Sequence, residues 1–167
     1  MSHWAALLVS LAALAAADAP RLSFVDLDDA PVELAAPKGR EALMVHFWAT
    51  WCPDCVKELA GLGRAARACA GTPVRLVVVD VGDGRGEVRD FLAAHPLDLR
   101  ALRDPHGAVW RQAVGGGGLP ANLVWTESGP RATVGPRGED DWRLELARLG
   151  CASPSTDVTG RLTIAAE

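Results

Sequence analysis

The segment FWATWCPDC, residues 47–55, decides the fold, because a buried strand and a helix meet there around a Cys-x-x-Cys pair. The run Ala42–Trp48, ALMVHFW, is apolar except at one position and predicts a central strand. Pro53 stands where a first-turn proline is favoured, and we expect a helix over residues 53–70 that ends at the Gly-Thr-Pro of residues 71–73. The two intervening residues let both sulfurs meet across the first helical turn.

The position of this pair at the start of a helix predicts thiol chemistry. Unpaired N–H groups and the helix dipole stabilise a thiolate there, so we expect Cys52 to be the attacking nucleophile. Cys55 lies one turn further along, should be more buried, and is expected to be the resolving thiol. Pro53 stiffens the turn, and the charge of Asp54 opposes the Cys52 thiolate, which favours a reductant over an oxidant.

Other uses of a Cys-x-x-Cys pair agree less well with the sequence. A structural zinc site needs two further ligands, and the chain has no second Cys-x-x-Cys and no His-x-x-x-His. The Pro-x-x-x-Thr/Ser-x-x-Cys pattern of peroxiredoxins is missing as well. A purely structural disulfide and a copper site formed by Cys52, Cys55 and a histidine remain alternatives. We expect no bound metal and no cofactor.

Composition limits the class of protein. The chain has 167 residues, about the size of one domain, with 49% hydrophobic and 23% charged residues. The net charge is −4, and lysine and arginine are scattered, which argues against nucleic-acid binding. We therefore expect one globular domain. A monomer is a separate expectation.

The N-terminus has the pattern of a secretory signal peptide. Residues 4–17 form an apolar and small-residue run too short to span a bilayer, and Ala15-Ala16-Ala17 suits signal peptidase. We expect residues 1–17 to be the signal peptide, residues 18–152 the globular domain and residues 153–167 a C-terminal tail. A buried alanine-rich helix or an uncleaved anchor remains an alternative, because no lysine or arginine precedes the run.

Strands and helices alternate along the rest of the chain, which predicts parallel strands with crossover helices and a closing antiparallel hairpin. The expected fold is α/β, a single mixed sheet with helices on both faces. The tail is expected to hold an edge strand over residues 161–164 or to be disordered. The other expected elements are a hairpin over residues 22–34, a strand over Val74–Val81, helices over residues 87–94, 108–113 and 139–149, and strands over residues 122–125 and 131–134.

Longer segments resemble one known family. VHFWATWCPDCVKEL, residues 45–59, resembles the active-site segment of the TlpA/ResA/CcmG branch of the thioredoxin-like proteins. FVDLDDAPVEL, residues 24–34, is similar to the N-terminal hairpin of that branch, and parts of residues 74–110 are similar to its strand and insertion. The resemblance implies a thioredoxin fold with an N-terminal β-hairpin extension, an insertion after the central strand, and a thioredoxin-like domain over residues 18–152.

The same likeness assigns roles to residues outside the cysteine pair. GGLPANLVW, residues 117–125, matches the Gly-x-Pro loop of the family, so Leu119–Pro120 is expected to be a cis peptide packed against the cysteines. That loop would shield the sulfurs and offer backbone groups to an extended substrate. His46 stands where thioredoxins keep a buried carboxylate, and it is either a proton relay beneath Cys55 or a hydrogen-bonded core histidine.

Three further side chains belong to the same segment. Trp51 is expected to be an exposed platform for substrate, whereas the other tryptophans of the domain are expected to pack in the interior. Lys57 and Glu58 follow the family pattern, and a solvated helix face explains them equally well.

Cys69 and Cys151 pose a separate question. One follows the active-site helix and the other follows the last helix, and in a thioredoxin fold both helices lie on one face of the sheet. Their ends then meet at the pole opposite the active site. A structural disulfide between them and two independent buried thiols are both open interpretations.

The resemblance, together with the cysteine pair, implies an exported reductase of protein disulfides that uses a Cys52–Cys55 cycle. Expected partners are protein dithiols and disulfides, such as apocytochrome c in cytochrome c biogenesis or copper-site thiols, and a membrane thiol reductant as electron donor. A disulfide oxidase or isomerase and a copper-binding thiol chaperone are the alternatives. The expected location is periplasmic or secreted, with a membrane tether if the signal is not cleaved.

Overall fold

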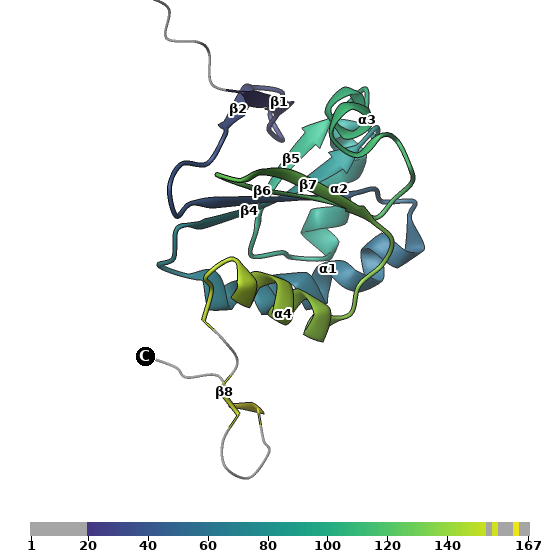
Figure 1. The fold of residues 1–167 in the computed structure, drawn as a ribbon. Helices are drawn as coiled ribbons and strands as arrows, with labels where there is room; N and C mark the ends of the chain where they lie inside the picture. The colour runs from purple at the N-terminus through teal and green to yellow at the C-terminus, as the bar shows by residue number, and fades with distance from the viewer. Residues whose placement is uncertain (1–19, 153–154, 157–161, 164–167) are drawn as a thin grey trace, which may run out of the picture.

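A seven-stranded sheet forms the centre of the protein, in the order β2-β1-β5-β4-β3-β6-β7 (Figure 1). The computed structural model describes residues 20–152, 155–156 and 162–163. The strands are β1 (Arg21–Val25), β2 (Pro31–Ala35), β3 (Ala42–Trp48), β4 (Val74–Val81), β5 (Arg100–Asp104), β6 (Ala121–Thr126) and β7 (Gly129–Val134). The helices are α1 (Pro53–Ala66), α2 (Arg85–Ala94), α3 (Ala108–Val114) and α4 (Glu139–Arg148), and a short 3-10 helix, Arg67–Cys69, follows α1.

The two strands at the middle of the sheet are buried on both faces, as their apolar sequences predict. Every residue of β3 is buried, and most of β4 is as well. β3 pairs in parallel with β4 and antiparallel with β6, and β4 pairs in parallel with β5. The predicted α/β fold with a mixed sheet is confirmed, and so are the bounds of β3 and β4.

Side chains that alternate along β3 enter two different cores. Met44 and Trp48 lie on the face of the sheet that α1, α2 and α4 cover. Val45 and Phe47 lie on the opposite face, which the β1–β2 hairpin and α3 cover. Figure 1 shows α1 and α4 side by side below the sheet and α3 on the other side. His46 shares its face with Met44 and Trp48, so its side chain lies beneath α1.

One strand was not predicted from the sequence. β5 has the sequence RALRD, and its last two residues, Arg103 and Asp104, are charged yet buried. Arg103 donates hydrogen bonds to the Asp29 carboxylate and to the Asp83 carbonyl, which satisfies its charge inside the protein. β5 connects the hairpin to the sheet, because Val25 of β1 pairs antiparallel with Arg103.

Two of the expectations concern the ends of the chain. The predicted signal peptide, residues 1–17, lies outside the described residues. In the tail, Ser155–Thr156 (β8) and Leu162–Thr163 (β9) pair antiparallel as a separate two-stranded sheet, so Leu162–Thr163 is not an edge strand of the main sheet. Within the described part of the chain, the helices are too short or too polar to cross a bilayer.

Candidate active site

Cys52 and Cys55 lie where β3 passes into α1, and they form a disulfide. β3 ends at Trp48, Cys52 is the N-cap of α1 and Pro53 is its first residue. The Cα atoms of the two cysteines are 5.3 Å apart, which suits a bridge across a single helical turn. The structure therefore brings the two residues that were predicted to be redox-active together in one bridge.

The helix start provides the electrostatics of the pair. The Cys55 backbone N–H donates to the Cys52 Sγ at 3.3 Å, so a Cys52 thiolate in the reduced protein would accept this bond at the positive end of the α1 dipole. Cys52 is 5% exposed and Cys55 is fully buried. Trp51, beside Cys52, is 66% exposed. Asp54 is also exposed and contacts Lys57 Nζ at 3.4 Å, which weakens the effect of its charge on Cys52.

The Leu119–Pro120 peptide is cis in the structure. Leu119 packs against the core that contains both cysteines, and the Pro120 carbonyl accepts a hydrogen bond from the Gly135 backbone N–H at 2.9 Å. The loop before it runs through glycines, and Gly118 has a φ of +119°, a conformation that favours glycine. The structure thus has the expected cis peptide.

His46 is fully buried and has a polar partner on each side. Its Nδ1 lies 2.9 Å from Oδ1 of Asn122 on β6, and its Nε2 lies 3.4 Å from Oε1 of Glu58 on α1. The Trp142 ring meets the imidazole edge-on, with ring centroids 5.7 Å apart. Burial lowers the pKa of His46 to about 4, against the opposing effect of the Asn122 hydrogen bond, so the ring is neutral near neutral pH.

Glu58 is the functional candidate that the sequence did not single out. It lies three residues after Cys55 and shares the buried face of α1 with Cys55 and Leu62. Its Oε2 accepts a hydrogen bond from the Arg137 backbone N–H at 2.6 Å. Burial raises the pKa of Glu58 to about 7, although that hydrogen bond and the Arg137 charge act the other way. The interpretation of Glu58 as part of a solvated helix face is wrong. The spacing from Cys55 was the signal that could have found it.

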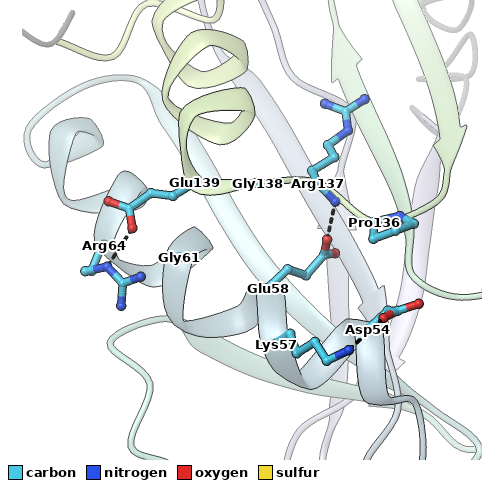
Figure 2. Close-up of a pocket in the computed structure, with 9 residues that line it drawn as sticks. All are labelled: Asp54, Lys57, Glu58, Gly61, Arg64, Pro136, Arg137, Gly138 and Glu139. Carbon is cyan, nitrogen blue, oxygen red and sulfur yellow. Dashed lines mark hydrogen bonds and ion pairs between the residues drawn. The ribbon is translucent and has the colours of Figure 1, made fainter.

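A pocket of about 190 Å³ leads from solvent to Glu58 (Figure 2). It lies between α1 and the segment that enters α4, and Figure 2 shows the Glu58 carboxyl pointing across it to the Arg137 backbone. Arg64 and Glu139 form an ion pair at 2.7 Å at one end, and Asp54 and Lys57 lie at the other. The pocket gives the buried carboxyl a route for proton exchange with water.

Two further carboxyls hold the loop that precedes the cysteines. The Thr50 backbone N–H donates to Asp83 Oδ2 at 2.7 Å, and the Asp83 backbone N–H donates to Asp80 Oδ1 at 3.1 Å. Burial and the neighbouring Asp83 raise the pKa of Asp80 to about 8, so Asp80 is protonated at neutral pH. No pattern in the sequence predicted this pair.

The second pair of cysteines is also bridged. Cys69 and Cys151 form a disulfide with a Cα separation of 4.5 Å, and the backbone N–H of Ala152 donates to the Ala68 carbonyl beside it at 3.0 Å. Of the two interpretations left open, the structure contains the bridge. Among the described residues, no group of three or more histidine, cysteine, aspartate or glutamate side chains is arranged to hold a metal.

Comparison with known proteins identifies the family. The model of the AhpC/TSA family matches residues 15–122. The chain belongs to the AhpC/TSA family. It is 28% identical over 87 residues to the thiol-disulfide oxidoreductase ResA of Bacillus subtilis, covering 52% of this chain and 48% of ResA.

A second relative and a solved structure agree with this assignment. The soluble secreted antigen MPT53 of Mycobacterium tuberculosis is 29% identical over 98 residues, covering 59% of this chain and 55% of MPT53. The chain thus spans about half the length of these curated relatives. A thiol:disulfide interchange protein of Chlorobium tepidum superposes with a TM-score of 0.66 at 26% identity, covering 80% of this chain and 96% of that protein. This AhpC/TSA member lies in the TlpA/ResA/CcmG-like branch with a thioredoxin-like fold, as its sequence predicted.

Proposed function

We propose that this protein is an exported thiol–disulfide oxidoreductase that reduces protein disulfides through Cys52 and Cys55. The observation that carries the proposal is the Cys52–Cys55 disulfide at the start of α1, with the Cys55 N–H directed at the Cys52 sulfur. The names of ResA and of the Chlorobium tepidum protein support the same chemistry. The substrates in this proposal are proteins, and the exposed Trp51 ring next to Cys52 in the chain offers them an apolar contact.

The proposed cycle begins with the reduced protein. The Cys52 thiolate attacks a substrate disulfide, forms a mixed disulfide, and releases one substrate thiolate. Cys55 then gives up its proton to the Glu58 carboxylate and attacks Cys52, which restores the Cys52–Cys55 bond and releases the second substrate sulfur. Two electrons pass to the substrate, and an external dithiol returns two electrons to the protein. We propose a membrane thiol reductant for that step.

The direction and the location are parts of the same proposal. The exposed Asp54 carboxylate beside Cys52 disfavours the thiolate, which favours a reductant. Export is supported by the signal-like N-terminus, by the second disulfide, and by the name of MPT53, a secreted protein. Substrates such as apocytochrome c or copper-site thiols, cleavage after residue 17, and a monomeric state belong to the proposal as well.

Three measurements test this function. The wild-type chain should reduce insulin with a dithiol donor, and Cys52→Ser should not. Cys55→Ala should accumulate mixed disulfides with its substrates, which identifies them. A reduction potential near thioredoxin's, about −270 mV, supports the reductase, whereas one near that of DsbA, about −120 mV, assigns an oxidase instead. Absence of Cys52-dependent insulin reduction would overturn the proposal.

A further inference from the structure

Two buried polar atoms face each other beneath the active-site helix, and each lacks a hydrogen-bond partner. They are His46 Nε2 and Glu58 Oε1, 3.4 Å apart, on side chains that are 0% and 2% exposed. Buried polar atoms are nearly always satisfied, and an unsatisfied one is costly. One proton between the two atoms satisfies both.

The other contacts of the two side chains fix where that proton sits. With the Asn122 amide placed so that Oδ1 faces the ring, that oxygen can only accept, so His46 Nδ1 carries the ring hydrogen and Nε2 presents a lone pair. Glu58 Oε2 is already held by the Arg137 backbone N–H. The hydrogen therefore belongs on Glu58 Oε1, from which the carboxylic acid donates to His46 Nε2.

We propose that His46, oriented by Asn122, is a positioning residue that stabilises the protonated form of the Glu58 carboxyl over its ionised form and so sets the pH at which Cys55 exchanges its proton. This inference rests on the proposed function and deepens it. In that role His46 never carries a positive charge. It accepts a hydrogen bond, and Glu58 makes and breaks the bond to the proton.

The step starts from the mixed disulfide between Cys52 and a substrate. The Cys55 proton passes to the Glu58 carboxylate, and the Cys55 sulfur bonds to Cys52 Sγ. The bond from Cys52 to the substrate breaks, and its electron pair leaves on the substrate sulfur. The new carboxylic acid donates to His46 Nε2, and it later loses its proton to water through the pocket that Glu58 lines (Figure 2). In the reverse reaction the acid returns a proton to the Cys55 thiolate.

The charged groups around His46 and Glu58 shift the protonation equilibrium of Glu58 in known directions. On α1, the Asp54 carboxylate favours the protonated form of Glu58. On the segment before α4, the Arg137 charge favours the ionised form of Glu58 and the neutral form of His46. Lys57 and Arg64 of α1 and Glu139 of α4 line the same pocket as Glu58, and Glu145 of α4 lies 3.7 Å from Arg137. Trp142 of α4 and Asn122 of β6 are uncharged. The pH at which the proton is lost is therefore set by burial and by the tautomer of His46 against the pull of Arg137.

The first test reads the tautomer directly. In the oxidised full-length chain labelled with nitrogen-15, the imidazole spectrum should show His46 neutral with hydrogen on Nδ1 at pH 6. The Nε2 resonance should shift with a midpoint near pH 7, where Glu58 titrates, and Glu58→Gln should abolish that inflection. Hydrogen on Nε2, a charged ring at pH 6, or an inflection that survives Glu58→Gln would each overturn the inference.

The second test changes which ring nitrogen of His46 carries the hydrogen. In Asn122→Leu, hydrogen is free to occupy Nε2 and donate to the Glu58 carboxylate, so the ionised form is stabilised. The pH midpoint of the Cys55-dependent step, the release of substrate from the mixed disulfide, should fall by about one pH unit. Val124→Ala changes the same face of β6 without touching the pair, and it should leave the midpoint in place.

The two failures can be told apart. If the wild-type chain reduces insulin and the midpoint of Asn122→Leu equals that of Val124→Ala, His46 is only a core residue and the inference is wrong while the function stands. If the wild-type chain shows no Cys52-dependent reduction, the function fails and the positioning role fails with it, whatever the spectrum shows.

Discussion

The two disulfides of this protein lie at opposite poles of one layer of helices. The Cys52–Cys55 bridge joins neighbours 3 apart in sequence at the N-terminus of α1. The Cys69–Cys151 bridge joins residues 82 apart, one after the C-terminal end of α1 and one after the C-terminal end of α4. A helix N-terminus stabilises a thiolate, and a helix C-terminus destabilises it.

In this protein the position of each cysteine, more than the bond it forms, distinguishes the two bridges. At the first pole an N–H group faces the outer sulfur, and a buried acid lies one turn away on the same helix. At the second pole, Ala152 and Ala68 are joined by a backbone hydrogen bond beside the bridge, which fixes the ends of two helices together. We therefore expect one bridge to cycle and the other to stay closed.

The largest effect is expected from a substitution that breaks the Cys52–Cys55 bridge. Cys52→Ser removes the nucleophile, and the rate of insulin reduction should fall by about 10⁴-fold. The unfolding midpoint should change little, because the side chain keeps its size and place at the N-cap. Cys151→Ser is the matched control and should retain most of the activity. Equal losses in both variants would contradict the division of roles between the two poles.

The next largest effect is expected when the Cys69–Cys151 bridge is removed. The double variant Cys69→Ala/Cys151→Ala opens a long loop of the unfolded chain, and the free energy of unfolding should fall by about 4 kcal/mol. Urea unfolding monitored by tryptophan fluorescence measures it. The rate of insulin reduction by the folded variant should stay within about twofold of wild type. A collapse of activity in a variant that remains folded would show that the distant bridge takes part in the cycle.

A smaller effect concerns the carboxyl pair that holds the loop before Cys52. The folded protein keeps a proton on Asp80, whose pKa is raised from 3.8 to about 8. The stability that comes from this group is complete below about pH 3.8, decreases as the pH rises, and is lost above about pH 8. Asp80→Asn stays neutral, so it should be more stable than wild type at pH 9 by about 2 kcal/mol and nearly equal at pH 4.

Urea unfolding at the two pH values checks this dependence. Asp98→Asn, which changes an exposed carboxylate, should show no such difference. If Asp80→Asn destabilises the protein equally at both pH values, the proton on Asp80 is not what holds Asp83 and the Thr50 loop together.

Much of the region around Cys52 and Cys55 could be predicted from the sequence. The bounds of β3 and β4 were predicted correctly, because each strand is an almost uninterrupted apolar run. Such a run is typical of a strand that is buried on both faces of a sheet. The family likeness provided the Leu119–Pro120 loop. Trp51 is exposed as predicted, because its place between a strand and a helix leaves the ring without a core to enter.

The features that were not predicted share one physical reason. In a sequence, a charged residue that is buried cannot be told apart from one that is exposed to solvent. Glu58 on a helix and Arg103 on β5 both suggest solvent contact until their partners are known. Those partners, the Arg137 backbone and the Asp29 carboxylate, are far away along the chain. Hydrophobic periodicity carries no information about such pairs, and so neither β5 nor the burial of Glu58 was predicted.

The smallest expected effect tests the charge beside Cys52. Asp54 is exposed and contacts Lys57, so Asp54→Asn should lower the pKa of the Cys52 thiol in the reduced protein by only about 0.3. The free energy of unfolding should change by less than about 0.5 kcal/mol. Thiolate absorbance against pH measures the shift, with Asp140→Asn, at an exposed site on α4, as the control. A thiol pKa that rises would mean that Asp54 stabilises the reduced form by a contact other than its charge.

The Cys69–Cys151 bridge also divides the chain mechanically. With the bridge intact, the segment from β4 to α4 is a closed ring, while β1, β2, β3 and α1 belong to the tail before it. In the sheet, however, β3 lies between β4 and β6, two strands of the ring. A force applied to the two ends of the chain would extract β3 and the Cys52–Cys55 pair from between them, but it could not lengthen the ring.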